Sequence, residues 1–422
     1  MESKYFPYIK ETIYFEELDN GLKVYLYPKP GFKKNYALFM TKFGSVDTRF
    51  KINGEFKTYP AGIAHFLEHK LFESEEGDVS LAFSKNGAET NAFTSFNRTA
   101  YLFNSTKDLE ENVELLLDFV QNPYFTEETV EKEKGIIKQE IAMYLDEPDS
   151  VSFFGPIHNM YFENAIKEDI AGSSESIDQI TYDMLYECYE IFYHPSNMAI
   201  FISGDFDPYQ MIEVVKNNQA KKNFTEKPEI IRYKFIENPK VKLETEKRIM
   251  DVTVPKYSIG IKLNITDDYV RKEIALSILF DMLIGKSSKN FEYMQEYELV
   301  SSDISMELYV EKEASFAIII FDSNKQEELD KYIKNLLLNV DKSTLNEENF
   351  TTLKRKFIGG YLIQIGSMEV VGNQYLAYDI KDFDFFEFLD VLNSITLEDV
   401  KEAASLITQD KITTFFINEK QK

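Results

Sequence analysis

The 422-residue chain contains no tryptophan and a single cysteine, Cys188. One cysteine cannot form a disulfide within the chain, which is typical of a reducing compartment and predicts a cytoplasmic protein. The first 20 residues mix charged and aromatic side chains and contain no apolar run of the kind that a secretory signal requires. No stretch approaches the roughly 18 uncharged apolar residues of a membrane-spanning helix. We therefore expect neither secretion nor a membrane partner.

Basic residues are also in deficit. The chain has 47 Lys and Arg against 72 Asp and Glu, a net charge of −25. Nucleic acids and anionic membrane surfaces are both bound by clustered Lys and Arg, so the composition excludes a general nucleic-acid binder. Hydrophobic residues make up 44% of the chain and charged residues 28%, which is close to the average of globular proteins. The 35 Phe and 26 Tyr supply large side chains for hydrophobic cores.

The pattern of apolar residues divides the chain into two halves with the same order of elements. Each half is expected to run through strands, a helix, a strand pair, several helices and a final strand, which is residues 198–204 in the first half and 411–418 in the second. A polar segment with few aromatic residues separates the halves. We predict an α+β fold with two duplicated units of about 200 residues each. The expected division is residues 1–217, a linker over 218–235, and residues 236–422.

Two of the four histidines lie in the short motif His65-Phe66-Leu67-Glu68-His69. On a helix, residues four apart lie about 40° apart around the axis, so His65 and His69 face the same side. Two imidazoles one turn apart suit the tetrahedral shell of zinc. Glu68 is the type of residue that takes a proton from a metal-bound water. A chance match is expected in on the order of one chain in a hundred, so the motif favours a catalytic zinc site.

A catalytic zinc needs a third protein ligand and an open fourth position. The two other histidines, His158 and His194, lie in a helix-like segment and before Pro195, positions that are more typical of structural roles. We therefore expect a carboxylate from a neighbouring element as the third ligand. The helix expected over residues 126–145 carries three candidates, and composition and spacing leave the choice open: Glu131, Glu133 and Glu140.

Four segments in this order resemble the insulinase, pitrilysin and mitochondrial processing peptidase family. His-x-x-Glu-His is the signature of the inverzincin zinc metallopeptidases. The segments are Gly62-Ile-Ala-His-Phe-Leu-Glu-His69, Gly87-Ala-Glu-Thr-Asn-Ala-Phe-Thr-Ser95, Glu133-Lys-Gly-Ile-Ile-Lys-Gln-Glu-Ile141, and Tyr193-His-Pro-Ser-Asn-Met198 continuing to Gly204. The resemblance covers nearly the whole chain and is to a single-length, bacterial-type subunit. It implies that each unit is a mostly antiparallel sheet covered by helices, and that the chain forms half of a clamshell.

The resemblance also implies roles for individual residues. His65, His69 and Glu140 are expected to bind one Zn²⁺ per chain. Glu68 is expected to be the general base, and Glu133 to support the geometry of the zinc site or catalysis. Three residues match the edge strand that pairs with the peptide substrate in the family, an interaction through main-chain hydrogen bonds: Asn91, Ala92 and Phe93. The implied activity is that of a zinc-dependent endopeptidase acting on extended peptides.

The second half departs from the family pattern. It carries no His-x-x-Glu-His, and it has Gln295 and Ser301 where family members often have an Arg and a Tyr that hold the substrate. The hypothesis is a heterodimer with a paralogue that lacks the zinc motif and supplies the Arg and Tyr; the alternative assembly is a homodimer. The alternative function is a non-catalytic or weakly active subunit that retains the fold for peptide binding or assembly.

Overall fold

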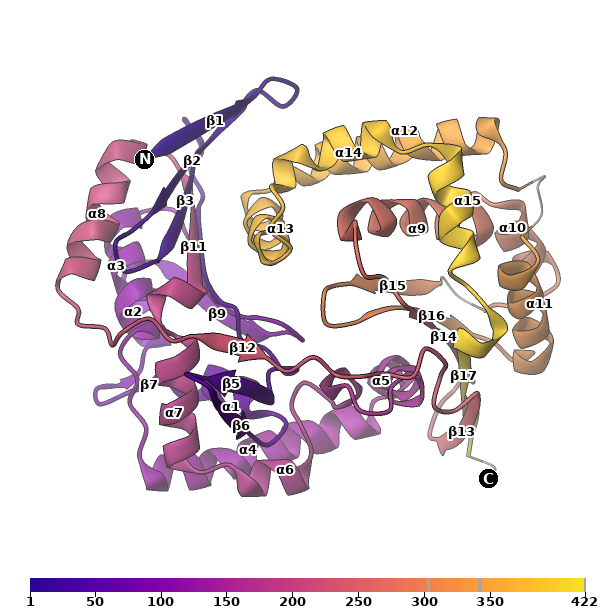
Figure 1. The fold of residues 1–422 in the computed structure, drawn as a ribbon, viewed down its shortest axis with the longest axis horizontal. Helices are drawn as coiled ribbons and strands as arrows, with labels where there is room; N and C mark the ends of the chain where they lie inside the picture. The colour runs from indigo at the N-terminus through magenta and orange to yellow at the C-terminus, as the bar shows by residue number, and fades with distance from the viewer. Residues whose placement is uncertain (302–303, 341–343, 421–422) are drawn as a thin grey trace. The chain divides into compact units, whose positions relative to one another are not determined.

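The computed structural model describes residues 1–301, 304–340 and 344–420 (Figure 1). The chain forms two compact units, and each is assembled from three separate stretches. The first unit contains Met1–Ile141, Glu168–Tyr233 and Gln364–Phe386, and the second contains Ala142–Lys167, Lys234–Ile363 and Glu387–Lys422. The predicted fold class, α+β with two similar halves, is confirmed by the element order and the two sheets.

A seven-stranded sheet forms the centre of the first unit, in the order β1-β2-β3-β11-β4-β10-β9. Its strands are β1 (Glu2–Phe6), β2 (Glu11–Glu17), β3 (Lys23–Pro28), β4 (Asn35–Thr41), β9 (Ala88–Thr94), β10 (Thr99–Ser105) and β11 (Met198–Gly204). Neighbours are antiparallel except β3 and β11. The strands β4 and β11 are buried along their whole length, because their nearly continuous apolar sequences suit central positions. β9 is the last strand, so one of its edges has no partner strand among the described residues.

The helices of the first unit cover this sheet and share its core. They are α1 (Ile63–Leu71), α2 (Ser80–Lys85), α3 (Leu109–Val120), α4 (Glu127–Asp146, as far as Ile141), α6 (Ser174–Gln179), α7 (Tyr182–Phe192), α8 (Pro208–Ala220) and α13 (Met368–Ile380). Aromatic and aliphatic side chains of β3, β4, β10 and β11 pack against α1, α3 and α7 in one hydrophobic cluster. The helix α1, which carries the His65–His69 motif, is therefore part of the core of this unit.

Short strands complete the first unit. The pair β5 (Arg49–Ile52) and β6 (Glu55–Thr58) is joined by β12 (Ile230–Arg232), and β7 (Glu73–Ser74) pairs with β8 (Gly77–Asp78). The strand β12 lies within the segment 218–235 that is expected as a linker. Arg232 donates a hydrogen bond to the buried Asp47, 2.7 Å away, so this end of the segment is attached to the first unit. The division at 217 and 236 along the chain stays a prediction.

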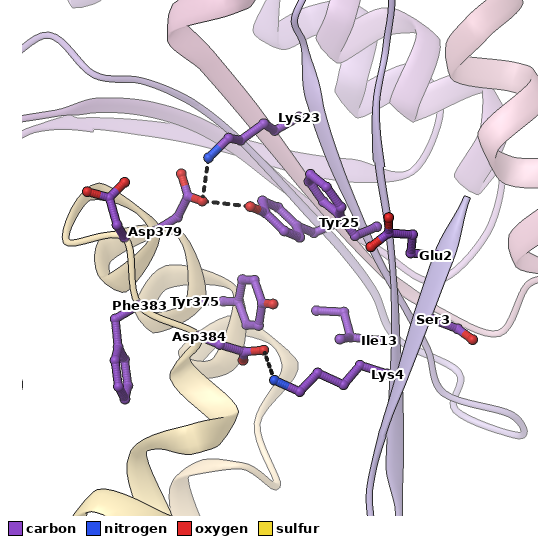
Figure 2. A pocket seen from close by; sticks show the side chains of 12 residues that line it. Glu2, Ser3, Lys4, Ile13, Lys23, Tyr25, Tyr375, Asp379, Phe383 and Asp384 are labelled. Atoms are coloured by element: carbon purple, nitrogen blue, oxygen red, sulfur yellow. Dashed lines mark hydrogen bonds and ion pairs between the residues drawn. The ribbon is translucent and has the colours of Figure 1, made fainter.

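The helix α13 comes from the second half of the sequence but packs on β4 and β11. Gly372 makes this close approach possible, because a Cβ there would lie 2.7 Å from the Tyr36 ring and 2.9 Å from the Phe201 ring. At the end of α13 the buried Asp379 accepts hydrogen bonds from Lys23 and Tyr25, at 2.9 and 2.6 Å (Figure 2). A cavity of about 390 Å³ lies beside them, between the strands β1–β3 and residues 375–384.

The second unit has a five-stranded sheet in the order β13-β17-β14-β16-β15. Its strands are β13 (Thr245–Met250), β14 (Lys256–Leu263), β15 (Ser305–Val310), β16 (Ser315–Asp322) and β17 (Ile412–Glu419). Its helices are α5 (Pro148–Met160), α9 (Tyr269–Ile284), α10 (Lys289–Glu296), α11 (Gln326–Leu338), α12 (Glu347–Gln364, as far as Ile363), α14 (Phe388–Ser394) and α15 (Leu397–Ser405). The helix α5, from the first half of the sequence, packs on β14 and β17.

Five neighbouring strands of the first sheet repeat the order of the second sheet. The order β3-β11-β4-β10-β9 matches β13-β17-β14-β16-β15, and in each sheet only the first of these pairs is parallel. The exchanged helices also correspond. A Cβ at Gly155 of α5 would lie 2.5 Å from the Phe415 ring, just as Gly372 faces Phe201, and each Phe is the fourth residue of its strand. The final strands lie where the sequence predicts them, at Met198–Gly204 and Ile412–Glu419.

No helix among the described residues is both long enough and apolar enough to span a bilayer. The longest, α4 and α12, carry many charged residues along their length.

Candidate metal site

The helix α1 carries the His65–His69 motif, and Gly62 is the N-cap residue that precedes it. Gly62 has φ of 87°, in the left-handed region that favours glycine, and a Cβ there would collide with the carbonyl oxygen of Ala171. Almost the whole helix is buried, because Ile63, Phe66 and Leu67 belong to the hydrophobic core. The motif residues are held in place by this packing.

The helix α4 presents two carboxylates toward the same region. Val130, Ile137 and Ile141 form its buried stripe, and Glu133 interrupts this stripe with a buried carboxylate. Glu140, seven residues later and so nearly on the same face, is half-buried. Glu131, the remaining candidate from the sequence, is exposed and pairs with Lys134 at 2.6 Å.

The two histidines of α1 converge on the carboxylate of Glu140. The Nε2 atom of His65 lies 3.8 Å from Glu140 Oε1, and Nε2 of His69 lies 3.5 Å from Glu140 Oε2. One ligand atom from each of these residues can be chosen so that all three lie within 4.8 Å of one another, the one such group found in residues 1–301, 304–340 and 344–420. Tetrahedral zinc with bonds of about 2.0–2.2 Å separates its ligand atoms by about 3.3–3.6 Å. The spacing therefore fits an ion held between these atoms better than direct hydrogen bonds.

The protonation of the two histidines differs. Burial, together with the neighbouring His69, lowers the pKa of His65 to about 4, so this imidazole is neutral near pH 7. Its Nδ1 atom is buried and has no hydrogen-bond partner in the described part of the chain. Burial alone would also lower the pKa of His69, but the hydrogen bond with Glu133 and the charges of Glu68 and Glu140 raise it. Metal binding requires neutral imidazoles, so a proton competes with a metal ion mainly at His69.

Glu133 orients His69. Its Oε1 atom lies 2.9 Å from Nδ1 of His69. An ionised carboxylate can only accept, so Nδ1 carries the proton and donates it to Glu133. The lone pair of His69 is then on Nε2, which is the atom that faces Glu140. A carboxylate behind a histidine in this way fixes the tautomer and ring orientation that a metal requires.

Glu68 lies on α1 between the two histidines and is buried, with 9% of its surface exposed. Burial raises the pKa of its carboxyl. The hydroxyl of Thr94, the last residue of β9, donates a hydrogen bond to Glu68 Oε2 at 2.7 Å. Thr94 lies in the segment Gly87–Ser95 that carries the family resemblance, but no spacing in the sequence distinguishes it from its neighbours.

The three residues expected to bind substrate, Asn91, Ala92 and Phe93, lie in β9 opposite Leu102, Tyr101 and Ala100 of β10. Asn91 is exposed, whereas Ala92 and Phe93 are half-buried. The Asn91 side chain accepts a hydrogen bond from the backbone N–H of Ala92 at 2.9 Å. The free edge of β9 and the metal-motif helix therefore belong to the same unit, joined through Thr94 and Glu68.

The other histidines lie elsewhere. His194 accepts a hydrogen bond from the backbone N–H of Ser196 through Nδ1, and its Nε2 lies 3.1 Å from the carbonyl oxygen of Thr225. It caps a short turn, as its position before Pro195 predicts. His158 lies in α5, in the second unit. Of the three glutamates that the sequence leaves open, Glu133 and Glu140 lie beside the histidines.

Comparison with known families gives two matches that together span most of the chain. Residues 57–173 match the family described as insulinase (peptidase family M16). Residues 179–357 match the family described as the peptidase M16 inactive domain. The first match contains the histidine motif and both carboxylates of α4.

Individual proteins resemble the chain over its full length. It is 45% identical over 412 residues to the "uncharacterized zinc protease YmfH" of Bacillus subtilis, which covers 96% of both chains. Among solved structures, an M16-like peptidase from Alicyclobacillus acidocaldarius is 33% identical, with a TM-score of 0.93 over 97% of this chain and 98% of that one. A protease from Helicobacter pylori shares the fold at 20% identity, with a TM-score of 0.85 over 97% of this chain and 99% of that one.

Proposed function

Because this chain belongs to the insulinase family (peptidase family M16), we propose that it is a zinc-dependent endopeptidase that hydrolyses extended peptides. The observation that carries the proposal is the convergence of two imidazole Nε2 atoms on one carboxylate, 3.5 and 3.8 Å away. Relatives across the full length of the chain are named zinc proteases, which supports the same reading.

In this proposal His65, His69 and Glu140 would hold one zinc ion per chain. The ion, when bound, would supply a Lewis acid that polarises the scissile carbonyl and lowers the pKa of water. Glu133 acts behind this set, because its hydrogen bond keeps Nε2 of His69 free of a proton.

Glu68 is the proposed general base, which takes a proton from water and later delivers it to the leaving amine. Its burial supports this role, since a carboxyl with a raised pKa accepts and returns protons more readily near neutral pH. Residues Asn91–Phe93 of β9 would hold the peptide as an added strand, through the edge of the sheet that faces away from β10.

The proposed assembly has a second chain that completes the substrate chamber. Gln295, in α10, and Ser301 stand where the family resemblance places an Arg and a Tyr, so we propose a heterodimer with a paralogue that supplies these groups. A homodimer that uses other groups is the alternative. The single cysteine supports a cytoplasmic location within the same proposal.

The same two positions favour a second candidate function, a non-catalytic or weakly active subunit that binds peptides or assists assembly. A chain without the Arg and Tyr would retain the fold and the metal but turn over little substrate by itself.

The test is hydrolysis of fluorogenic peptides by the purified full-length protein, with its zinc content measured in the same samples. We expect chelator-sensitive turnover that returns when zinc is added. Glu68→Gln should retain zinc and lower kcat by about 100-fold to 10,000-fold, because only the proton transfer is removed. Glu128→Gln, at an exposed position on α4, is the matched control.

Two outcomes would contradict the proposal. Ordinary turnover by zinc-loaded Glu68→Gln would exclude Glu68 as the base. A zinc-loaded wild-type protein without turnover, both by itself and with its paralogue, would favour the non-catalytic function. Ordinary turnover by the homodimer would instead exclude the need for a paralogue.

A further inference from the structure

The carboxylate of Glu68 is buried, and its orientation depends on one neighbour. Among the described residues, the Glu68 side chain accepts one hydrogen bond, from Thr94 Oγ1 to its Oε2 atom at 2.7 Å. A carboxylate on a helix rotates about its terminal bond at little cost unless hydrogen bonds fix it. The contact therefore decides which oxygen of Glu68 is occupied and leaves Oε1 for another partner.

Thr94 is itself held by the sheet. It is the last residue of β9 and lies directly opposite Thr99 of β10. The Thr99 hydroxyl donates to the carbonyl oxygen of Phe43 at 2.8 Å and lies 3.4 Å from Thr94 Oγ1. The pairing of β9 with β10 therefore holds Thr94 in place.

The direction of the Thr94 hydrogen bond follows from chemistry. A hydroxyl has one proton to donate, and an ionised carboxylate can only accept. The Thr94 proton is therefore committed to Glu68, while its lone pairs face the hydroxyl of Thr99. Hydrogen bonds to a charged group are stronger than those between neutral groups, so this contact restrains the base more than an ordinary side-chain contact would.

We propose that Thr94 is the positioning residue of Glu68: it fixes the carboxylate so that Oε1 faces the water that Glu68 deprotonates. This inference rests on the proposed peptidase function and deepens it. Thr94 follows Asn91–Phe93 directly in β9, so one strand both pairs with the peptide and aims the base. Because the hydroxyl touches neither the peptide backbone edge nor the metal ligands, its loss acts on kcat and leaves KM and zinc binding unchanged.

The test compares three threonine variants of the full-length protein. Thr94→Val keeps the shape of the side chain but removes its proton, and it should lower kcat by about 10-fold to 100-fold. KM for the fluorogenic peptide and the zinc affinity, measured by competition with a chelator, should both stay within about twofold of wild type. Thr94→Ser retains the hydroxyl and should restore most of kcat.

Thr90→Val is the matched control. Thr90 lies four residues earlier in the same strand, and its hydroxyl donates to the backbone carbonyl of Leu102 at 2.9 Å rather than to Glu68. It removes the same hydroxyl from the same strand, so its kcat should remain near that of wild type. The double variant Glu68→Gln, Thr94→Val should be no slower than Glu68→Gln, because Thr94 acts only through Glu68.

The outcomes separate this inference from the proposed function. An active wild-type enzyme with unchanged kcat in Thr94→Val would overturn the positioning role alone. So would Thr94→Ser that is as slow as Thr94→Val, or a loss of zinc affinity that accounts for the lower rate. A zinc-loaded wild type without turnover, by itself and with its paralogue, would overturn both.

Discussion

The two halves of the chain contain the same pair of helices, and only the pair in the first half brings two histidines and a glutamate together. The helices α4 and α12 both begin with a pair of glutamates after a capping residue: Thr126 accepts from the N–H of Thr129, and Asn346 from that of Asn349. Counted from these starts, Glu133 corresponds to Leu353 and Glu140 to Gly360. Glu133 and Leu353 are both buried. The same helix position therefore carries a carboxylate in the first half and an aliphatic side chain in the second.

The helices that precede them differ in the same way. α1 buries His65 and Glu68 among apolar residues, whereas every buried residue of α9 is apolar. A buried imidazole or carboxylate lowers the stability of the fold unless a partner compensates. The second half has the same arrangement of strands and helices without a buried histidine or glutamate in α9. The burial of His65 and Glu68 in the first half is what the proposed metal site would explain. This comparison can be tested by substitutions at matched positions.

The largest effect is expected from removing a metal ligand. Glu140→Gln should reduce zinc to well below one ion per chain and abolish the zinc-dependent turnover, because two imidazoles alone bind zinc weakly. Gly360→Gln, at the corresponding position of α12, should leave both unchanged. The zinc content of dialysed protein measures this. Full zinc in Glu140→Gln, or loss of zinc in Gly360→Gln, would contradict the assignment of the ligands.

A smaller loss is expected from the carboxylate behind His69. Glu133→Gln keeps the size of the side chain but weakens its hold on the Nδ1 proton, and it should reduce zinc affinity by about 10-fold to 100-fold. Competition with a chelator gives the affinity. If Glu133→Gln binds zinc as tightly as wild type, Glu133 does not orient the ligand, and its burial would need another explanation.

Zinc binding should depend on pH through His69. Its pKa is raised above the ordinary value, so its proton is retained to higher pH and competes with zinc as the pH falls. Where the imidazolium predominates, apparent affinity should fall about tenfold per pH unit. His65, with a pKa of about 4, adds nothing between about pH 6 and pH 8. In Glu133→Gln the decline should begin at a lower pH, because the hydrogen bond that raises the pKa of His69 is weakened. An identical onset in both proteins would contradict this reading.

The smallest effect is expected from substitutions of the glycines inside α4 and α12. Gly135 in α4 and Gly360 in α12 lie inside helices, and a Cβ at either position meets no atom within 4 Å. Gly135→Ala and Gly360→Ala should therefore each stabilise the protein by about 0.5–1 kcal/mol, because alanine loses less backbone entropy in a helix. Scanning calorimetry should show a rise of about 1–4 °C in the unfolding midpoint. A fall in either variant would show that these glycines have a packing role that the comparison misses.

Much of the fold could be predicted from local patterns. The helix expected over residues 126–145 is α4, Glu127–Asp146, because its apolar stripe and capping threonine are both local signals. The edge hairpin β1–β2 (Glu2–Phe6 and Glu11–Glu17) could not be predicted, because its charged residues obscure the alternation of a strand. The exchange of α5 and α13 between the units could not be predicted either, since Gly155 and Gly372 reveal their role only when Phe415 and Phe201 lie opposite them.

The candidate site shows the same limit. The spacing of His65 and His69 on one helix is a local signal, so the motif could be recognised in the sequence. The choice among the glutamates of α4 depends on which face meets α1, which is a property of packing. Thr94 is further from prediction still, because its contact with Glu68 joins a strand end to a helix 26 residues earlier in the chain.

We expect the chain to bind one metal ion, through residues of its first half. The most direct test is the zinc content per chain of the purified full-length protein, after dialysis against metal-free buffer and reloading with a slight excess of zinc. We expect one tightly bound zinc per chain. A protein that retains no zinc, or that binds two equivalents with similar affinity, would contradict it.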